Sequence, residues 1–213
     1  MSGTTWRSDV AAVNSGAAVA NLTLTYTPYA SGSTAIVRTA TLASNATCEW
    51  QDVLTSLFGL VSTASDKGAI KVVTDQPVYS SGRTYNQTAS GTMGDDVPTV
   101  VVSQALTTGQ TGIIPQLKKN AAFRTNVGIS NLGTTTVIAT VTLFGATGAQ
   151  IGTPRTLTAE VGHYYQQDDI FGTTTVDIAY ATVQVQTAGG RVWAYGSVVD
   201  AITGDPTNVP VLQ

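Results

Sequence analysis

The sequence predicts an all-β protein made of two tandem antiparallel β-sandwich modules related by internal duplication. Three observations lead to this fold class. Apolar residues alternate along short segments, turn residues punctuate them about every 8–12 positions, and one segment recurs later in the chain. With 213 residues, 42% of them hydrophobic, the chain can form two cores of about 100 residues each.

The recurring segment starts at Trp6 and again, 117 positions later, at Phe123. Over residues 6–25, six positions are identical in the two copies: Arg7, Val10, Asn14, Gly16, Thr23 and Thr25. Shorter matches follow at offsets of 114 and 112, namely residues 78–82 with 192–196 and 97–98 with 209–210. A falling offset is what small loop deletions produce. We therefore expect the copies to superpose, with Arg7 on Arg124, Asn14 on Asn131 and Pro98 on Pro210.

The modules are expected at residues 1–103 and 121–213, with a linker containing strand-like segments at 104–120. Residues 22–26 and 139–143 are apolar at every second position, which is the clearest strand pattern in the chain. This alternation predicts burial of Val10, Leu22, Leu24, Val127, Val141 and Leu143, with Thr23, Thr25, Thr140 and Thr142 facing solvent. Further strands are expected at 35–42, 47–51, 69–74 and 78–85, and at 153–158, 162–167, 180–187 and 192–199.

Two local features are expected inside the modules. Asn14 and Asn131 stand where the chain turns, and their side chains are expected to bond the turn backbone. Residues 52–59 fit one helical turn with Asp52 as its cap and Val53, Leu54, Leu57 and Phe58 facing inward.

Strand-like residues 99–116 precede the second module, whereas only residues 1–5 precede Trp6 in the first. This difference predicts an unpaired sheet edge in the first module, which invites strand addition by another chain. Residues 209–213 are a candidate donor for head-to-tail assembly. In the alternative interpretation, residues 3–7 and the inter-module segment cover the edge within one chain.

Composition excludes some functions and locations. The net charge is −3, only 11% of residues are charged, and no basic stripe exists to bind a phosphate backbone, so nucleic acid is not an expected partner. No apolar run approaches the roughly 20 residues of a membrane-spanning helix. Low charge with abundant Thr is typical of secreted proteins. We expect an extracellular or cell-surface protein whose leader is absent from this sequence, with a cytoplasmic location left open.

The residues resemble a module found, often in tandem, in secreted bacterial proteins of uncharacterised function. The resemblance rests on Trp6-Arg7-Ser8-Asp9-Val10 with Asn14 and Gly16, on residues 22–26 and 52–59, and on Asp75-Gln76-Pro77-Val78. More distantly, the order of strands and turns is similar to that of the sensory rhodopsin transducer family. That likeness implies a small β-sandwich linked to ligand or carbohydrate binding and to oligomers, and it implies no catalytic residue.

Catalysis finds little support in the sequence, so no enzyme activity and no cofactor are expected. There is one histidine, His163, and one cysteine, Cys48, and no G-x-S-x-G, H-E-x-x-H, C-x-x-C or P-loop motif. A carboxylate pair can hydrolyse glycosides, but Asn126 replaces Asp9 in the second copy. Asp95-Asp96 and Asp168-Asp169 lack the spacing of a calcium loop, so no metal is expected.

The candidate site residues are two polar pairs and two adjacent tyrosines. Arg7 with Asp9, and Arg124 with Asn126, share one strand face and form either a clamp that stabilises each module or part of a ligand groove. Tyr164 and Tyr165 are adjacent, so one ring of the pair must face outward from a strand, where sugars could stack. The aromatic pairs Trp6/Phe123 and Tyr79/Trp193 are expected to pack in the cores.

Together these features favour a non-enzymatic extracellular or cell-surface structural or adhesive protein, assembling head-to-tail into a filament or oligomer. Its expected partners are other copies of itself or a cell-surface polysaccharide. The alternative is a carbohydrate-binding module, which an exposed row of aromatic rings on one sheet would favour.

Overall fold

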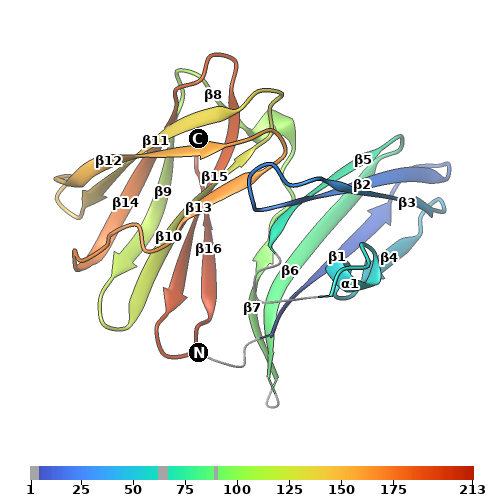
Figure 1. Cartoon of the computed structure of the whole chain (residues 1–213), viewed down its shortest axis with the longest axis horizontal. Helices are drawn as coiled ribbons and strands as arrows, with labels where there is room; N and C mark the ends of the chain where they lie inside the picture. Colours follow the sequence, from blue (N-terminus) through green and yellow to red (C-terminus); the bar gives the residue numbers. More distant parts are fainter. Residues whose placement is uncertain (1–4, 62–66, 89–90) are drawn as a thin grey trace. The chain divides into compact units, whose positions relative to one another are not determined.

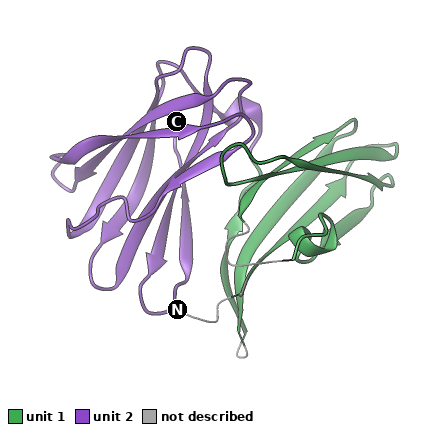
Figure 2. Cartoon of the chain, in the orientation of Figure 1, with its two compact units in different colours: residues 1–99 green, residues 100–213 purple. Residues whose placement is uncertain are grey.

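The computed structural model describes residues 5–61, 67–88 and 91–213, and it confirms an all-β fold. Strands take up 61% of the described residues and helix 3%. The chain divides into two compact units, unit 1 (Met1–Thr99) and unit 2 (Val100–Gln213) (Figure 2). In the described residues each unit has a sandwich-like arrangement of two antiparallel sheets around its own core (Figure 1).

Unit 1 contains seven strands and one short helix within its described residues. In chain order they are β1 (Thr5–Asn14), β2 (Ala20–Pro28), β3 (Ile36–Leu42), β4 (Thr47–Trp50), α1 (Val53–Ser56), β5 (Gly68–Thr74), β6 (Val78–Thr88) and β7 (Gly91–Val97). One sheet has the strand order β4-β1-β6-β7 and the other the order β3-β2-β5.

The core of unit 1 lies between these sheets, where period-2 alternation places the apolar side chains. Leu22, Leu24 and Ala12 are buried, together with Val53 and Phe58 from the α1 region. The predicted burial of Leu22 and Leu24 is thus confirmed, and Thr23 between them is exposed. Val10, which we also expected to be buried, is only half-buried.

Unit 2 contains nine strands and one 3-10 turn. They are η1 (Val102–Gln104), β8 (Leu106–Thr107), β9 (Thr111–Lys119), β10 (Phe123–Asn131), β11 (Val137–Gly145), β12 (Gln150–Ala159), β13 (Tyr164–Gln167), β14 (Val176–Val185), β15 (Arg191–Asp200) and β16 (Pro206–Pro210). One sheet has the order β13-β10-β15-β16, with β8 also paired to β15, and the other has the order β12-β11-β14-β9.

The core of unit 2 is larger than that of unit 1 and more completely buried. Val127, Val141 and Leu143 are buried as predicted, while Thr140 and Thr142 are half-buried. β9 contributes Ile114 and Leu117, whose side chains are fully buried in this core. On its other edge, β9 is joined to the end of the chain: the Ile113 and Leu212 backbones exchange two hydrogen bonds of 2.9 and 2.8 Å.

The boundary between the two units lies a few residues before the boundary predicted from the sequence. Unit 1 ends at Thr99 rather than at residue 103, and residues 104–120, expected as a linker, belong to unit 2. The physical reason is burial: this segment supplies β8 and β9, and Leu106 and Ile114 are fully buried in the core of unit 2.

Strands in the same place in the two units also pair in the same register. Asn14 lies opposite Val78 in β1 and β6, as Asn131 lies opposite Val192 in β10 and β15. Leu24 lies opposite Val72 in β2 and β5, and Val141 lies opposite Val183 in β11 and β14. The sheet orders β4-β1-β6-β7 and β3-β2-β5 therefore correspond to β13-β10-β15-β16 and β12-β11-β14. β9 is an additional strand next to β14.

The predicted helical turn forms as α1, but Asp52 does not cap it in the expected way. Asp52 is the N-cap residue, yet it has the left-handed φ of 45° and its side chain makes no capping hydrogen bond. The end of the segment is held from β3 instead, because the Arg38 guanidinium donates to the backbone carbonyls of Leu57 (3.2 Å) and Phe58 (3.1 Å).

Candidate functional site

The Asp9 side chain of β1 bonds the loop before α1 in unit 1, and we call this contact a loop clamp. Its Oδ1 accepts hydrogen bonds from the backbone N–H of Asp52 (2.8 Å) and from the Tyr85 hydroxyl (3.2 Å). Burial raises the pKa of Tyr85, and the charge and hydrogen bond of Asp9 raise it further. Arg7 lies on the same face of β1 as Asp9, two residues away, and is exposed. The Asp9 carboxylate therefore holds the backbone at the start of α1.

Asn126 holds the matching loop in unit 2. Its Oδ1 accepts a hydrogen bond from the backbone N–H of Asp169 (3.0 Å) and another from Arg124 Nη1 (2.8 Å). Asp169 has the same left-handed φ of 45° as Asp52. The predicted contact between Arg124 and Asn126 is present, and the same Asn126 oxygen also holds the loop at Asp169.

One further ion pair lies beside this clamp. Lys119 Nζ is 2.5 Å from Asp169 Oδ2. The other carboxylate oxygen, Oδ1, is buried and has no hydrogen-bond partner among the described residues. We find no group of three or more His, Cys, Asp or Glu side chains placed to hold a metal ion in the parts of the chain that the structure describes.

Asn14 and Asn131 are buried and bond the turns that follow β1 and β10. The Asn14 Nδ2 donates to the carbonyls of Ala18 (2.8 Å) and Leu42 (3.0 Å), and its Oδ1 accepts from the Gly16 N–H (2.8 Å). Asn131 makes the matching bonds to Thr135, Ala159 and Gly133 at 2.8, 3.0 and 2.9 Å. The expected turn-bonding role of both asparagines is present.

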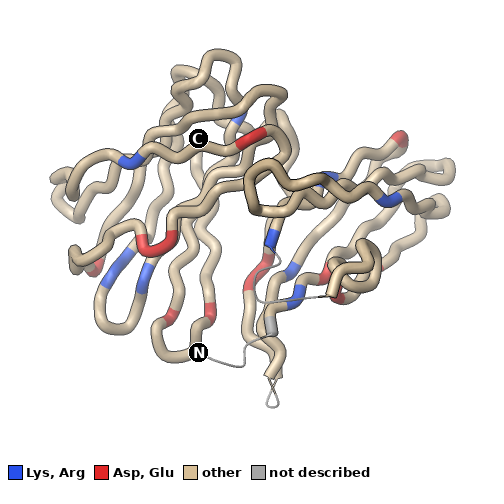
Figure 3. The backbone as a smooth tube through the Cα atoms, in the orientation of Figure 1, with Lys and Arg blue, Asp and Glu red and all other residues tan. Residues whose placement is uncertain are grey.

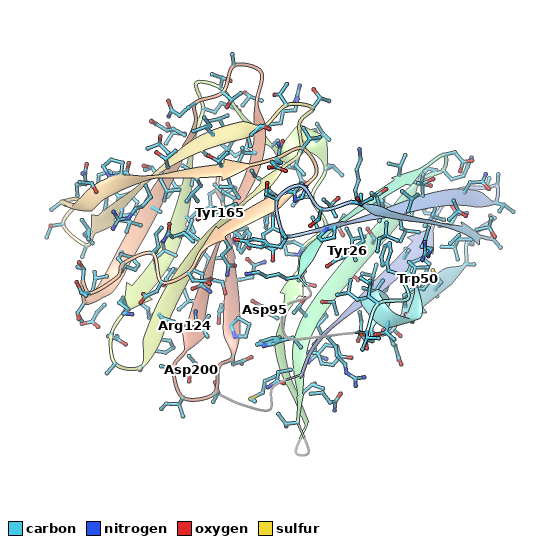
Figure 4. All side chains as sticks on the ribbon, in the orientation of Figure 1. Tyr26, Trp50, Asp95, Arg124, Tyr165 and Asp200 are labelled. Carbon is cyan, nitrogen blue, oxygen red and sulfur yellow. The ribbon has the colours of Figure 1, made fainter. Side chains whose placement is uncertain are left out.

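Tyr164 and Tyr165 point to opposite faces of β13. Tyr165 pairs with Ile129 in β10 and packs against the core of unit 2, and Figure 4 labels it on its strand. Tyr164 pairs with Ser130 and lies on the outer face, where it is half-buried. One tyrosine of the pair therefore faces outward, as the sequence required.

The outer face of β13-β10-β15 carries three aromatic rings around small residues. Ser130 lies between Tyr164 and Trp193 on the neighbouring strands, and Gly128 lies between Gln166 and Tyr195. Directly paired residues share a sheet face, and the face of Ser130 and Gly128 is opposite that of the buried Ile129.

The rings on this outer face also contact one another. The rings of Trp193 and Tyr195 stack with their centroids 5.5 Å apart, and the Tyr195 hydroxyl donates to Gln166 Oε1 at 2.9 Å. Gly128 makes room for this arrangement, because a Cβ at that position would overlap the Tyr195 ring. By their parity on β10, Arg124 and Asn126 lie on the same face. Gln166 and Gly128 were missed in the sequence, where a glycine inside a strand was the available signal.

The prediction that both aromatic pairs pack in cores is wrong for unit 1. Trp6 is 40% exposed and Tyr79 is 70% exposed, whereas Phe123 is partly buried against the core of unit 2. Trp193 is partly buried beside residues of that core but lies on the outer face of its sheet. Tyr79 pairs with Val13 on the outer face of its sheet, because the neighbouring residues Ala12 and Val78 face the core.

The edge of β5 differs from the other sheet edges of unit 1. Among the described residues, β3, β4, β5 and β7 are edge strands in unit 1, and the counterparts of β3, β4 and β7 are edges in unit 2 as well. The counterpart of β5 is β14, which is flanked by β9. Ile70 and Val72 on β5 are half-buried, whereas their counterparts Ala181 and Val183 are fully buried.

The candidate donor residues 209–213 are engaged within unit 2. Val209 and Pro210 pair with β15, Val211 N donates to the Ala194 carbonyl (3.0 Å), and Leu212 bonds Ile113. Charged side chains are sparse in both units, and those in the described residues form no basic stripe (Figure 3). None of the helices in the described residues has the length and hydrophobicity that crossing a membrane requires.

No protein family matches this sequence, and a search of curated proteins finds no similar one.

Proposed function

We propose that this chain is a non-enzymatic structural protein, extracellular or at a cell surface, that works by associating with other chains. One observation carries the proposal: within the described residues, the sheet of unit 1 ends at β5, in the place where the sheet of unit 2 continues with β9. An edge strand presents a row of backbone donors and acceptors, and a second chain can satisfy them.

The use made of the repeated polar residues supports this interpretation. Asp9, Asn126, Asn14 and Asn131 all bond the backbone of loops within their own units. They stabilise the fold and are not arranged around a reacting group. We further propose that the two units descend from one duplicated module, which the shared register of β1–β6 and β10–β15 supports.

Light scattering over a range of concentrations tests the proposal. We expect the mass to rise above that of one chain as concentration increases, and we expect Val72→Lys to abolish the rise by placing a charge at the inner face of the edge. Val73→Lys is the matched control, because Val73 lies on the same strand but is 51% exposed on its outer face. A wild-type chain that stays a monomer at high micromolar concentration would contradict self-association.

Carbohydrate binding is a second candidate, supported by Tyr164, Trp193 and Tyr195 on the outer face of unit 2. Aromatic rings offer an apolar surface to a sugar, and the exposed Arg124 on the same face offers hydrogen-bond donors. We expect soluble polysaccharides to change the tryptophan fluorescence, and Trp193→Ala to abolish binding. Tyr180→Ala is the control, since Tyr180 stacks on Phe144 in the other sheet of unit 2. An unchanged affinity of Trp193→Ala would exclude this surface.

A further inference from the structure

Alternate residues of β5 direct their backbone N–H and C=O groups away from β2. The Tyr29 N–H donates to the Lys67 carbonyl at 2.8 Å, which fixes the parity of the antiparallel ladder. Ala69, Lys71 and Val73 therefore direct their backbone groups toward β2, while Ile70 and Val72 direct theirs toward the other edge. Among the described residues no strand lies along that edge.

In unit 2 the same backbone positions bond β9. Ile114 lies opposite Ala181 and Gly112 opposite Val183, the counterparts of Ile70 and Val72. The Ile113 backbone bonds Leu212 on the far side, so by alternation Gly112 and Ile114 direct their backbone groups toward β14. β9 therefore bonds the backbone groups of Ala181 and Val183, and a strand added to β5 in the same register would bond those of Ile70 and Val72.

A glycine in unit 1 leaves space for the side chains of such a strand. In unit 2, a Cβ on Gly196 would lie 2.8 Å from Leu117 Cδ2 and 3.0 Å from Ile114 Cγ2, so glycine makes room for both residues of β9. Gly82 occupies the matching position in β6, and a Cβ there would lie 3.4 Å from its nearest neighbour, the Val97 carbonyl oxygen. Its φ is not in the left-handed region, so the backbone of unit 1 does not itself require glycine there.

We propose that the edge of β5 accepts an extended donor strand of the β9 type from a separate polypeptide. The donor runs antiparallel to β5, with a small residue opposite Val72 and an aliphatic residue opposite Ile70. A second aliphatic side chain, equivalent to Leu117, lies over Gly82. This proposal deepens the proposed function, on which it rests, by naming the chemistry of the partner.

One observation favours a separate polypeptide over a described segment of this chain. The described segments with the required pattern are already paired, since β9 bonds β14 and Val211 and Leu212 bond unit 2.

Binding of a labelled peptide with the sequence of residues 111–119 to the full chain tests the proposal by fluorescence anisotropy. We expect saturable one-to-one binding, and no binding of the same peptide with aspartate in place of Ile114 and Leu117. Gly82→Ala in the protein should weaken binding by roughly tenfold or more, because its Cβ occupies the space of both aliphatic side chains. Thr23→Ala is the control, because Thr23 is exposed on the outer face of β2, and this change should leave peptide binding unaltered.

Hydrogen exchange provides a second measurement that does not depend on any variant. The amides of Ile70 and Val72 should become protected when the peptide is added, while those of Lys71 and Val73 are already protected by β2. Protection of Ile70 and Val72 in the free, dilute chain would overturn the proposal, because a segment of the same chain would then cover the edge. Protection that appears only with rising concentration would support the proposal and would identify the separate polypeptide as a second copy of this chain.

The two proposals can fail separately. A chain that stays monomeric but binds the peptide contradicts self-association and supports the donor strand. A chain that associates but binds the aspartate peptide as well as the parent peptide supports association and overturns the donor strand.

Discussion

Asn14 and Asn131 lie 117 positions apart, and their side chains bond backbone carbonyls at the same distances along the sequence. Each side-chain amide donates to the carbonyls 4 and 28 residues further on. The first of these bonds closes the turn after the strand, and the second ties that turn to the end of β3 or β12. One asparagine in each unit therefore fixes how its two sheets are joined.

Replacing either asparagine by alanine should destabilise its own unit. The change leaves buried carbonyl groups without a donor, so we expect Asn14→Ala and Asn131→Ala each to cost about 2–4 kcal/mol of unfolding free energy. Urea denaturation measures the loss. Asn21→Ala is the control, because Asn21 is exposed and bonds the exposed Asp75, and it should cost less than about 1 kcal/mol.

Asp9 should tolerate asparagine but not alanine. Asn126 performs the same loop-holding role with a neutral oxygen, so Asp9→Asn should change the unfolding free energy by less than about 1 kcal/mol. Asp9→Ala leaves the Asp52 N–H without its acceptor and should cost about 1–3 kcal/mol. If Asp9→Asn proves as costly as Asp9→Ala, the carboxylate charge and not its hydrogen bond is what unit 1 needs.

Val72 and Val183 form a matched pair for testing how complete each core is. They occupy the same register position, but Val72 is half-buried and Val183 is fully buried. Val183→Ala should therefore cost about 2 kcal/mol or more, and Val72→Ala less than about 1 kcal/mol, because less apolar area is lost. Equal losses in chemical denaturation would show that the core of unit 1 is as well covered as that of unit 2.

Stability should fall at alkaline pH through Tyr85. Burial, with the charge of Asp9, raises the pKa of Tyr85 above its ordinary value of 10.0 in the folded chain. The contribution of the neutral hydroxyl is complete below the unfolded-state pKa and is lost as the pH rises through the raised folded-state pKa. Urea unfolding of the wild type and Tyr85→Phe between about pH 8 and pH 11 measures the difference. Tyr79→Phe, at an exposed ring, should follow the wild type.

The strands were predictable because their signals are local. The alternation in residues 22–26 and 139–143 identifies β2 and β11, and the repeated asparagines mark the turns before them. The sheet face of a residue near a strand end is harder to predict, because a shift of one position in the strand places its side chain on the opposite face. This is why Tyr79, which matches the aromatic Trp193 in the sequence, was expected in the core and is instead exposed.

Other features depend on contacts between distant segments, which no local pattern contains. An unpaired sheet edge was predicted for unit 1, but only the sheet order of the described residues identifies β5 as an edge strand whose counterpart β14 is flanked by β9. Likewise, the function of Gly128 and Gly196 as space for Tyr195 and for β9 becomes visible only when their strands are paired. The clamps of Asp9 and Asn126 were anticipated as polar pairs, but their partners, 43 residues away, were not.

The bonds between Ile113 and Leu212 have a mechanical consequence. Near the point where the chain enters unit 2, the Gln104 carbonyl accepts a hydrogen bond from the side chain of Gln213 at the chain's last position. Tension applied to the two ends of unit 2 therefore acts first on the contact between Gln104 and Gln213 and, from the C-terminal side, on the bonds of Leu212 to Ile113, while the pairing of β8 with β15 holds the N-terminal side. Strands pulled apart in this geometry yield at lower force than strands that must slide past one another. Unit 2 would begin to open at this seam, while the β11–β14 and β10–β15 ladders still hold.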